Sequence, residues 1–345
     1  MAALDKISST DPRIARSSAE INGKTYGFLC AIPEGGFERT IVLIHGFPDL
    51  SFGWRYQIPL FLDLGYRVIC PDCIGYGQSM ISSVLQNNLV VLIPLSVDTI
   101  GKAANIITFY LRAYTSDHDC LIRGAMIAYR MAIWHPEFVT HIFTACVPYI
   151  LPNAEWVELE SLTKIYPTLG YQLQFGSGLI EQETRTKEGI HKFLNAMYDG
   201  RTSHNQSAMD PNKGLNFDLA AQLERAAVLS EEELEYYVNE FARNGLGAAC
   251  NYYRTHRQNF LDESYFTQQE NSDAATIKCP TLFLCATEDI CVTPEMTEHI
   301  KKSVINLTFK EINANHWILW EEPGVVNEVL REWFRQQGLV INKGP

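Results

Sequence analysis

Two segments near the end of the chain carry residues that could act together as an acid–base pair. Asp289 ends the apolar run TLFLCATED, and His316 follows a weaker run, NLTFKEIN. If both runs are parallel strands, their carboxyl ends lie at one sheet edge, where a carboxylate and a histidine can pair. The acid would fix the imidazole tautomer and stabilise the imidazolium that forms. Glu288, one residue before Asp289, is the competing candidate for the acid.

A third candidate segment stands at the end of the first apolar run, RTIVLIHG. It consists of His45, Gly46, Phe47 and Pro48. A glycine and a proline there can turn the backbone so that an amide N–H faces a pocket, where it would stabilise developing negative charge. An ordinary strand-to-loop turn is the alternative interpretation of the same residues.

These segments need a framework, and the hydrophobic pattern predicts one. The runs RTIVLIHG, YRVICPD and TLFLCATED are short and apolar, as buried parallel strands are, and NLTFKEIN is a weaker fourth. Helical stretches such as AMIAYRMAIWHPE and PGVVNEVLREWFRQQG accompany them. Alternation of strands and helices favours a parallel sheet built from βαβ units.

The middle of the chain differs, because its pattern is almost entirely helical. One stretch, LSEEELEYYVNEFARNG, begins with a capping box of Ser230 and Glu233 and ends at Gly245. We therefore expect a helical cap inserted into an α/β core. The expected segments are the first part of the core at residues 1–147, the cap at 148–262 and the second part of the core at 263–345.

Composition limits the classes of function. The 345 residues carry a formal net charge of −12 and no basic run, which argues against a nucleic-acid partner. Among the nine cysteines only Cys70 and Cys73 form a close pair, without the second pair of a zinc site, so we expect reduced thiols and no metal. The N-terminal residues lack the apolar segment of a secretory signal, and the apolar residues 89–95 are too few for a membrane span. We expect a cytoplasmic protein.

Residues 45–79 resemble, almost residue for residue in type, the corresponding stretch of the soluble epoxide hydrolase family. The landmarks are HGFP, Trp54-Arg55-x-Gln57, Gly65-Tyr66-Arg67-Val68, Pro71-Asp72 and Gly75-Tyr76-Gly77-x-Ser79. The resemblance covers most of the chain apart from residues 80–123. It implies an α/β-hydrolase fold, with a mostly parallel sheet flanked by helices and an inserted helical cap. It also assigns one N–H of an oxyanion hole to Phe47.

The resemblance extends to the residues that would perform the reaction. It implies that Asp289 orients His316 and that this histidine activates a water. The segments YQLQF and NYYR resemble two cap segments of the family, whose tyrosines donate hydrogen bonds to the epoxide oxygen; the matching residues are Tyr171 and Tyr253. Phenols suit this role because the departing alkoxide is far more basic than a phenolate. The implied pocket consists of His45, Gly46, Phe47, Pro48, Trp54, Phe175 and Trp317.

The family's nucleophile is an aspartate in a segment like GHDWGA, and here the chain departs from that pattern with DHDCLIRGA. In one alignment Asp119 is the nucleophile, the N–H of Cys120 is the second oxyanion donor, and three extra residues precede Gly124. In the other alignment Leu121 and Ile122 end the preceding strand, and no nucleophile remains.

The resemblance implies an enzyme that converts a hydrophobic epoxide to a vicinal diol through a covalent aspartyl ester, without a cofactor, as a monomer or homodimer. A dehalogenase or another α/β-hydrolase is one alternative. Paired tyrosines disfavour a dehalogenase, because a halide leaves without a proton, and the serine-hydrolase motif Gly-x-Ser-x-Gly does not occur. A catalytically inactive hydrolase-fold protein, or a faulty gene model, is the other alternative. Two departures from the family pattern favour this inactive alternative. One is the segment 117–124, and the other is the atypical segment 80–97, which we interpret as a surface insertion or as retained non-coding sequence.

Overall fold

A computed structural model describes residues 4–340 apart from residues 22, 80–122, 269–274 and 293. Within these residues the strands form one sheet in the order β1-β2-β4-β3, a second in the order β5-β8-β9 and a small two-stranded ladder. β3 pairs in parallel with β4, and β5, β8 and β9 are all parallel, whereas β1 and β2 form an antiparallel hairpin. The strands of the two sheets are β1 (Ile14–Ile21), β2 (Lys24–Ala31), β3 (Arg39–Val42), β4 (Tyr66–Pro71), β5 (Ile142–Ala145), β8 (Thr281–Ala286) and β9 (Leu307–Ile312).

All four predicted strands form. β4, β8 and β9 lie within the expected runs, and β3 covers the first half of RTIVLIHG. Beyond β3, the N–H of Leu43 still donates to the carbonyl of Ile69 at 2.9 Å, and the chain then turns away. The side chains of β3, β4 and β8 are mostly buried, because strands of a parallel sheet are covered on both faces.

Helices cover the sheets, as the alternating pattern predicts. α1 (Gln57–Asp63), which follows the short 3-10 helix η1 (Ser51–Trp54), packs against β4, and α14 (Pro323–Gln336) packs against α1. α3 (Arg123–Trp134) packs against β5. α12 (Pro294–Ser303) follows β8, and α13 (Ile318–Glu321) follows β9. None of the described helices is both long and apolar enough to cross a membrane.

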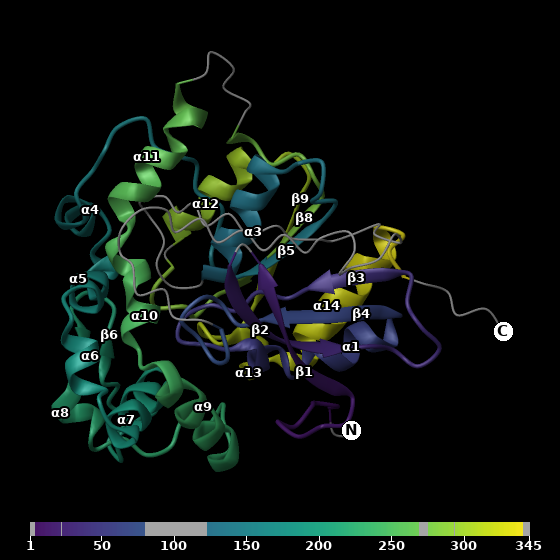
Figure 1. The fold of residues 1–345 in the computed structure, drawn as a ribbon. Helices are drawn as coiled ribbons and strands as arrows, with labels where there is room; N and C mark the ends of the chain where they lie inside the picture. The colour runs from purple at the N-terminus through teal and green to yellow at the C-terminus, as the bar shows by residue number, and fades with distance from the viewer. Residues whose placement is uncertain (1–3, 22, 80–122, 269–274, 293, 341–345) are drawn as a thin grey trace.

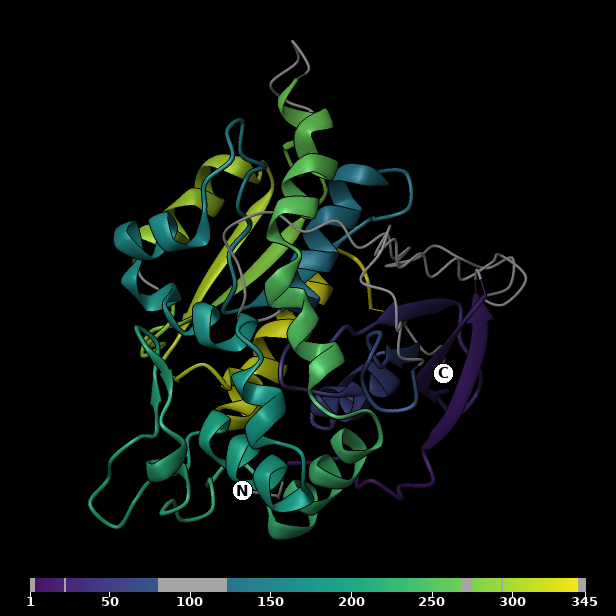
Figure 2. The ribbon, with the colours of Figure 1, turned by 60° about the vertical axis from the view of Figure 1, so that its left-hand side comes forward.

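A block of helices lies between β5 and β8 in the chain and to one side of the sheets in space (Figures 1 and 2). We call these the inserted helices. They are α4 (Leu159–Ile165), η2 (Pro167–Leu169), α5 (Tyr171–Gly176), α6 (Leu179–Glu183), α7 (Lys187–Met197), α8 (Phe217–Ala220), α9 (Glu231–Asn244), α10 (Gly247–Cys250), η3 (Asn251–Arg254) and α11 (His256–Thr267), with the small ladder of β6 (Met209–Asp210) and β7 (Gly214–Leu215).

The ends of α9 follow the sequence prediction. Ser230 Oγ accepts the N–H of Glu233 at 3.2 Å, and Glu233 Oε2 accepts the N–H of Ser230 at 2.8 Å, so the capping box is confirmed. Gly245 follows the last turn with φ +68°, a left-handed conformation that glycine adopts without steric cost.

Two buried ion pairs join the inserted helices to the rest of the molecule. Arg130 of α3 contacts Glu263 of α11 through Nε–Oε1 at 2.5 Å and Nη2–Oε2 at 3.2 Å, and both side chains are 1% exposed. Arg55 Nε lies 3.0 Å from Oε1 of Glu233 at the start of α9, and the side chain of Arg55 is fully buried. Because buried charges need partners, these pairs restrict how the inserted helices can sit against the sheets.

Candidate active site

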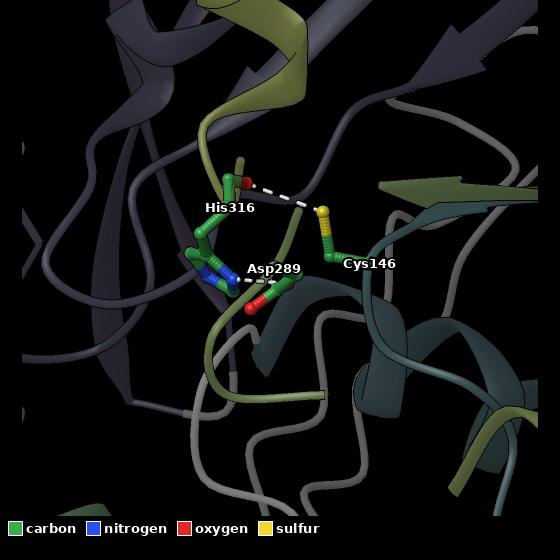
Figure 3. A group of neighbouring side chains, drawn as sticks. All are labelled: Cys146, Asp289 and His316. Atoms are coloured by element: carbon green, nitrogen blue, oxygen red, sulfur yellow. Dashed lines mark hydrogen bonds and ion pairs between the residues drawn. The ribbon is translucent and has the colours of Figure 1, made fainter. Parts of the chain in front are cut away.

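The carboxyl ends of β8 and β9 bring Asp289 and His316 together. The two strands pair in parallel along their whole length, so the loops that follow them leave the sheet at one edge. Asp289 Oδ2 accepts a hydrogen bond from His316 Nδ1 at 2.7 Å (Figure 3). The two residues that the sequence indicates as an acid–base pair are thus in direct contact.

The surroundings of Asp289 keep its carboxylate ionised. Burial alone would raise its pKa, and the side chain is 1% exposed. The charge and hydrogen bond of His316 act against burial and lower the pKa of Asp289. The N–H groups of Cys291 and Val292, which donate to Oδ1 at 2.8 and 3.3 Å, lower it further. These effects outweigh burial, so the pKa of Asp289 lies below its ordinary value. The ionised acid holds the proton of His316 on Nδ1 and leaves Nε2 as the basic nitrogen.

Glu288, the competing acid, is placed elsewhere. Its side chain is exposed, and its N–H donates to the carbonyl of Ala314 at 3.0 Å. The geometry therefore selects Asp289 as the residue that can orient His316.

The other ring nitrogen of His316 is available for chemistry. Nε2 is buried, and within the described ranges of the chain it has no hydrogen-bond partner. His316 lines two cavities, so a water bound in either could reach this nitrogen. A neutral imidazole with an available lone pair can take a proton from such a water.

Cys146 is the third polar side chain at this edge, and no sequence pattern pointed to it. It follows β5 directly, with φ +64°, a conformation that is uncommon for a residue other than glycine. Its thiol donates to the backbone carbonyl of His316 at 3.2 Å, and its sulfur lies within 4.8 Å of ligand atoms of Asp289 and His316 (Figure 3).

These three residues do not fit a metal site. A metal needs a thiolate, but burial and then the nearby Asp289 raise the pKa of the Cys146 thiol well above its usual value. The direct bond of 2.7 Å between Asp289 and His316 also leaves no room for an ion between them. Because the thiol bonds to the main chain of His316 rather than to its ring, it is not arranged as a nucleophile either.

The predicted oxyanion turn, residues 45–48, is held in place by its own histidine. His45 Nδ1 lies 2.7 Å from the carbonyl of Gly46, and Nε2 accepts the N–H of Cys73 at 2.9 Å. Both ring nitrogens therefore bind backbone groups, which gives His45 a structural task. All four residues of the turn are buried, and Phe47 lines both cavities.

The two predicted phenols lie together above this turn. Tyr171 of α5 and Tyr253 of η3 are 0% and 3% exposed, and their ring centroids are 6.2 Å apart. Phe175 packs between them, with ring centroids 5.2 and 5.3 Å away, and Phe47 lies 5.2 Å from Tyr253. The structure thus gathers two predicted donors and two predicted pocket residues in one aromatic cluster. Neither tyrosine is among the described residues that line the two cavities with His316.

The two cavities meet at Phe47, His316 and Trp317, which line both. The first has a volume of about 810 Å³ including its open mouth, and its walls include the end of β3, part of β5 and Trp54. The second, of about 570 Å³ on the same basis, is bounded by the end of α7 and by Met209. Their mostly apolar walls suit a hydrophobic small molecule.

The predicted nucleophile, Asp119, is not among the residues that the structure describes. Asp119 and Cys120 lie outside the described residues, as does the atypical segment 80–97.

Comparison with known proteins identifies the family. The family model of the alpha/beta hydrolase fold matches residues 39–323, which include both sheets' parallel strands, the inserted helices and the Asp289–His316 pair. The chain therefore belongs to the α/β-hydrolase fold family.

Several of its relatives within that family are epoxide hydrolases. The chain is 32% identical to epoxide hydrolase srdG of Neurospora crassa, across 96% of this chain and 98% of that protein. It is 28% identical to epoxide hydrolase A of Mycobacterium tuberculosis, across 85% of this chain and 89% of that protein. A solved structure of potato epoxide hydrolase matches with a TM-score of 0.72 and 25% identity, across 94% of this chain and 99% of that one. The chain belongs to the epoxide hydrolase family, as its motifs predict.

Proposed function

We propose that this protein opens a hydrophobic epoxide to a vicinal diol through a covalent ester at Asp119. The observation that carries the proposal is the Asp289–His316 pair, whose histidine lines two apolar cavities together with Phe47. Family membership and the aromatic cluster of Tyr171 and Tyr253 support the same reaction.

In the first step the carboxylate of Asp119 attacks an epoxide carbon. A bond from the carboxylate oxygen to that carbon forms as the ring C–O bond breaks, which gives an ester. Tyr171 and Tyr253 donate hydrogen bonds to the departing oxygen, and one of them passes it a proton. Burial of both tyrosines supports this role, because a hydrogen bond in a dry site stabilises a developing alkoxide more strongly than in water.

In the second step His316 Nε2 takes a proton from water, and the resulting hydroxide attacks the ester carbonyl. The N–H of Phe47 stabilises the tetrahedral oxyanion. Collapse breaks the ester C–O bond, and the alkoxide that leaves takes the proton from His316, which completes the diol. The acid formed at Asp119 loses its proton, and this proton restores the tyrosinate.

The test uses styrene oxide as the probe. The wild-type protein should form the diol, and His316→Ala should accumulate a protein whose mass is increased by one epoxide, with the adduct on the peptide that contains Asp119. Replacing both Tyr171 and Tyr253 with Phe should abolish ring opening, whereas Tyr265→Phe, at an exposed tyrosine, should not. A folded wild-type protein that forms neither diol nor ester contradicts the proposal.

The second candidate is a hydrolase-fold protein without its nucleophile. The sequence DHDCLIRGA, which departs from the family elbow, favours it. Sequencing the transcript across residues 80–124 decides whether the encoded segment is the one in the cell.

We further propose that residues 148–262 are a cap over a core of residues 1–147 and 263–345. The position of the inserted helices between β5 and β8 supports an inserted cap, and α11 crosses its proposed end, because this helix runs from His256 to Thr267. We also propose a cytoplasmic location, supported by eight described cysteines that are all free thiols.

A further inference from the structure

The C-terminal end of α7 contacts both loops on which ester hydrolysis would depend. Tyr198 directly follows this helix, and its hydroxyl donates to the backbone carbonyl of Pro48, in the turn that carries Phe47. The carbonyl of Met197, one residue earlier, accepts the indole N–H of Trp317 at 2.8 Å, and Trp317 follows His316. Two consecutive residues, the last of α7 and the one after it, therefore bond to the loop of His316 and to the oxyanion turn.

Ring contacts reinforce this bridge. The Tyr198 ring lies edge-on to Trp317 with centroids 4.8 Å apart, and to Trp320 at 5.2 Å. The neighbouring Tyr237 of α9 donates to Oδ1 of Asp49, the residue directly after this turn, at 2.7 Å. Tyrosines that follow α7 and lie on α9 thus bond to the last residue of the turn and to the residue after it.

The hydroxyl of Tyr198 is suited to be a permanent donor. The side chain is 0% exposed, and burial raises its pKa well above the usual value, so the phenol keeps its proton. Without this hydroxyl, the Pro48 carbonyl would lose a buried partner, and the turn would have to shift to find another.

We propose that Tyr198 is a positioning residue that sets the oxyanion turn and the His316 loop relative to each other, and so controls ester hydrolysis rather than ring opening. The inference rests on the proposed function. Ring opening uses the nucleophile and the two phenols, and neither the Phe47 N–H nor His316 Nε2 acts in it. Hydrolysis uses both groups at the same carbonyl, so their relative placement affects that step alone.

The test compares Tyr198→Phe with Tyr149→Phe. Tyr149 is a matched control, because it is also 0% exposed and its hydroxyl also donates to a backbone carbonyl, that of Ala275, at 2.5 Å. With styrene oxide, Tyr198→Phe should slow ester hydrolysis roughly tenfold and change ring opening less than about twofold. Tyr149→Phe should lower the melting temperature similarly and leave the ratio of the two rates unchanged.

A second readout needs no turnover. Hydrogen exchange measured by mass spectrometry should speed up in both peptides 45–50 and 315–320 of Tyr198→Phe, and in neither peptide of Tyr149→Phe. Equal slowing of both chemical steps overturns the inference, and so does faster exchange confined to one peptide. Absence of diol and ester in every protein refutes the proposed function, and the exchange pattern then still decides whether Tyr198 couples the two loops.

Discussion

Replacing Asp289 with asparagine should stop ester hydrolysis, because the backbone dictates how the new amide is oriented. Asp289 Oδ1 accepts the N–H groups of Cys291 and Val292 at 2.8 and 3.3 Å, and Oδ2 faces His316 Nδ1 at 2.7 Å. The amide must turn its oxygen toward the two N–H donors, since its NH₂ group would otherwise face them. The NH₂ group then faces Nδ1, which has to accept, so the imidazole proton moves to Nε2.

An imidazole that already carries its proton on Nε2 cannot accept a second proton from water at that nitrogen. The same substitution in the serine-protease triad, the general precedent for a wrong tautomer, lowers kcat by about 10⁴. We expect ester hydrolysis in Asp289→Asn to fall by about 10³–10⁴, or roughly 4–5 kcal/mol of activation free energy. Ring opening should change little, since neither Asp289 nor His316 acts in that step.

Rapid mixing with styrene oxide, followed by acid quench and mass measurement, separates the two steps. The variant should accumulate the ester. Nitrogen NMR of labelled histidine should report the tautomer even without substrate, with Nδ1 protonated in the wild type and Nε2 in Asp289→Asn. Glu288→Gln makes the same chemical change at the exposed neighbour and should behave as the wild type. Retention of hydrolysis within about tenfold, or an unchanged tautomer, would refute the reasoning.

Two further predictions concern stability. Glu263→Gln removes the carboxylate that contacts the Arg130 guanidinium, and the side chain of Arg130 is 1% exposed. Urea unfolding should show a loss of about 3–5 kcal/mol, most of it recovered in Arg130→Met/Glu263→Leu, and a loss below about 1 kcal/mol contradicts this. Burial raises the pKa of Asp49 in the folded protein above its ordinary 3.8. The stability that this shift contributes is fully present below pH 3.8 and is lost as the pH rises through the pKa of Asp49 in the folded protein. Asp49→Asn should therefore gain stability relative to the wild type between pH 4 and pH 7, and a difference that does not vary with pH refutes it.

Local patterns predicted the parts of the fold that depend on local physics. Apolar runs gave β4 and β8, because strands covered on both faces need continuous hydrophobic sequence. The weaker run NLTFKEIN gave β9, whose side chains are mostly accessible. Ser230 and Glu233 marked the start of α9, because both partners of a capping box lie within one helical turn. The contact between Asp289 and His316 followed from the rule that parallel strands end at one sheet edge.

Features that depend on distant contacts carried no such signal. The hairpin of β1 and β2 was not predicted, since half of the residues in IARSSAEI are polar and most of its side chains are accessible. β5 has only four residues, too few for a clear pattern. The bond from Tyr198 to Pro48 joins residues 150 positions apart, and nothing distinguishes this tyrosine from the other fifteen in the sequence. The backbone conformation of Cys146 and its bond to His316 were likewise invisible.

The packing of Gly124 shows where the departure from the family pattern should act. A Cβ at Gly124 would lie 2.0 Å from the carbonyl oxygen of Ile44, so only glycine lets the start of α3 approach the end of β3. Asp119 stands five residues before Gly124, three more than the aspartate of GHDWGA stands before its glycine. Five residues can span up to about 17 Å, whereas the two residues of the family link can span up to about 7 Å. The longer segment between Asp119 and Gly124 replaces the two-residue link that fixes the carboxylate in the family pattern. A nucleophile that is misplaced by about 1 Å reacts roughly 100-fold more slowly. The effect should therefore fall first on ring opening. Hydrolysis also depends on where Asp119 lies, because the ester carbonyl belongs to this residue, whereas the structure places Phe47, Asp289 and His316.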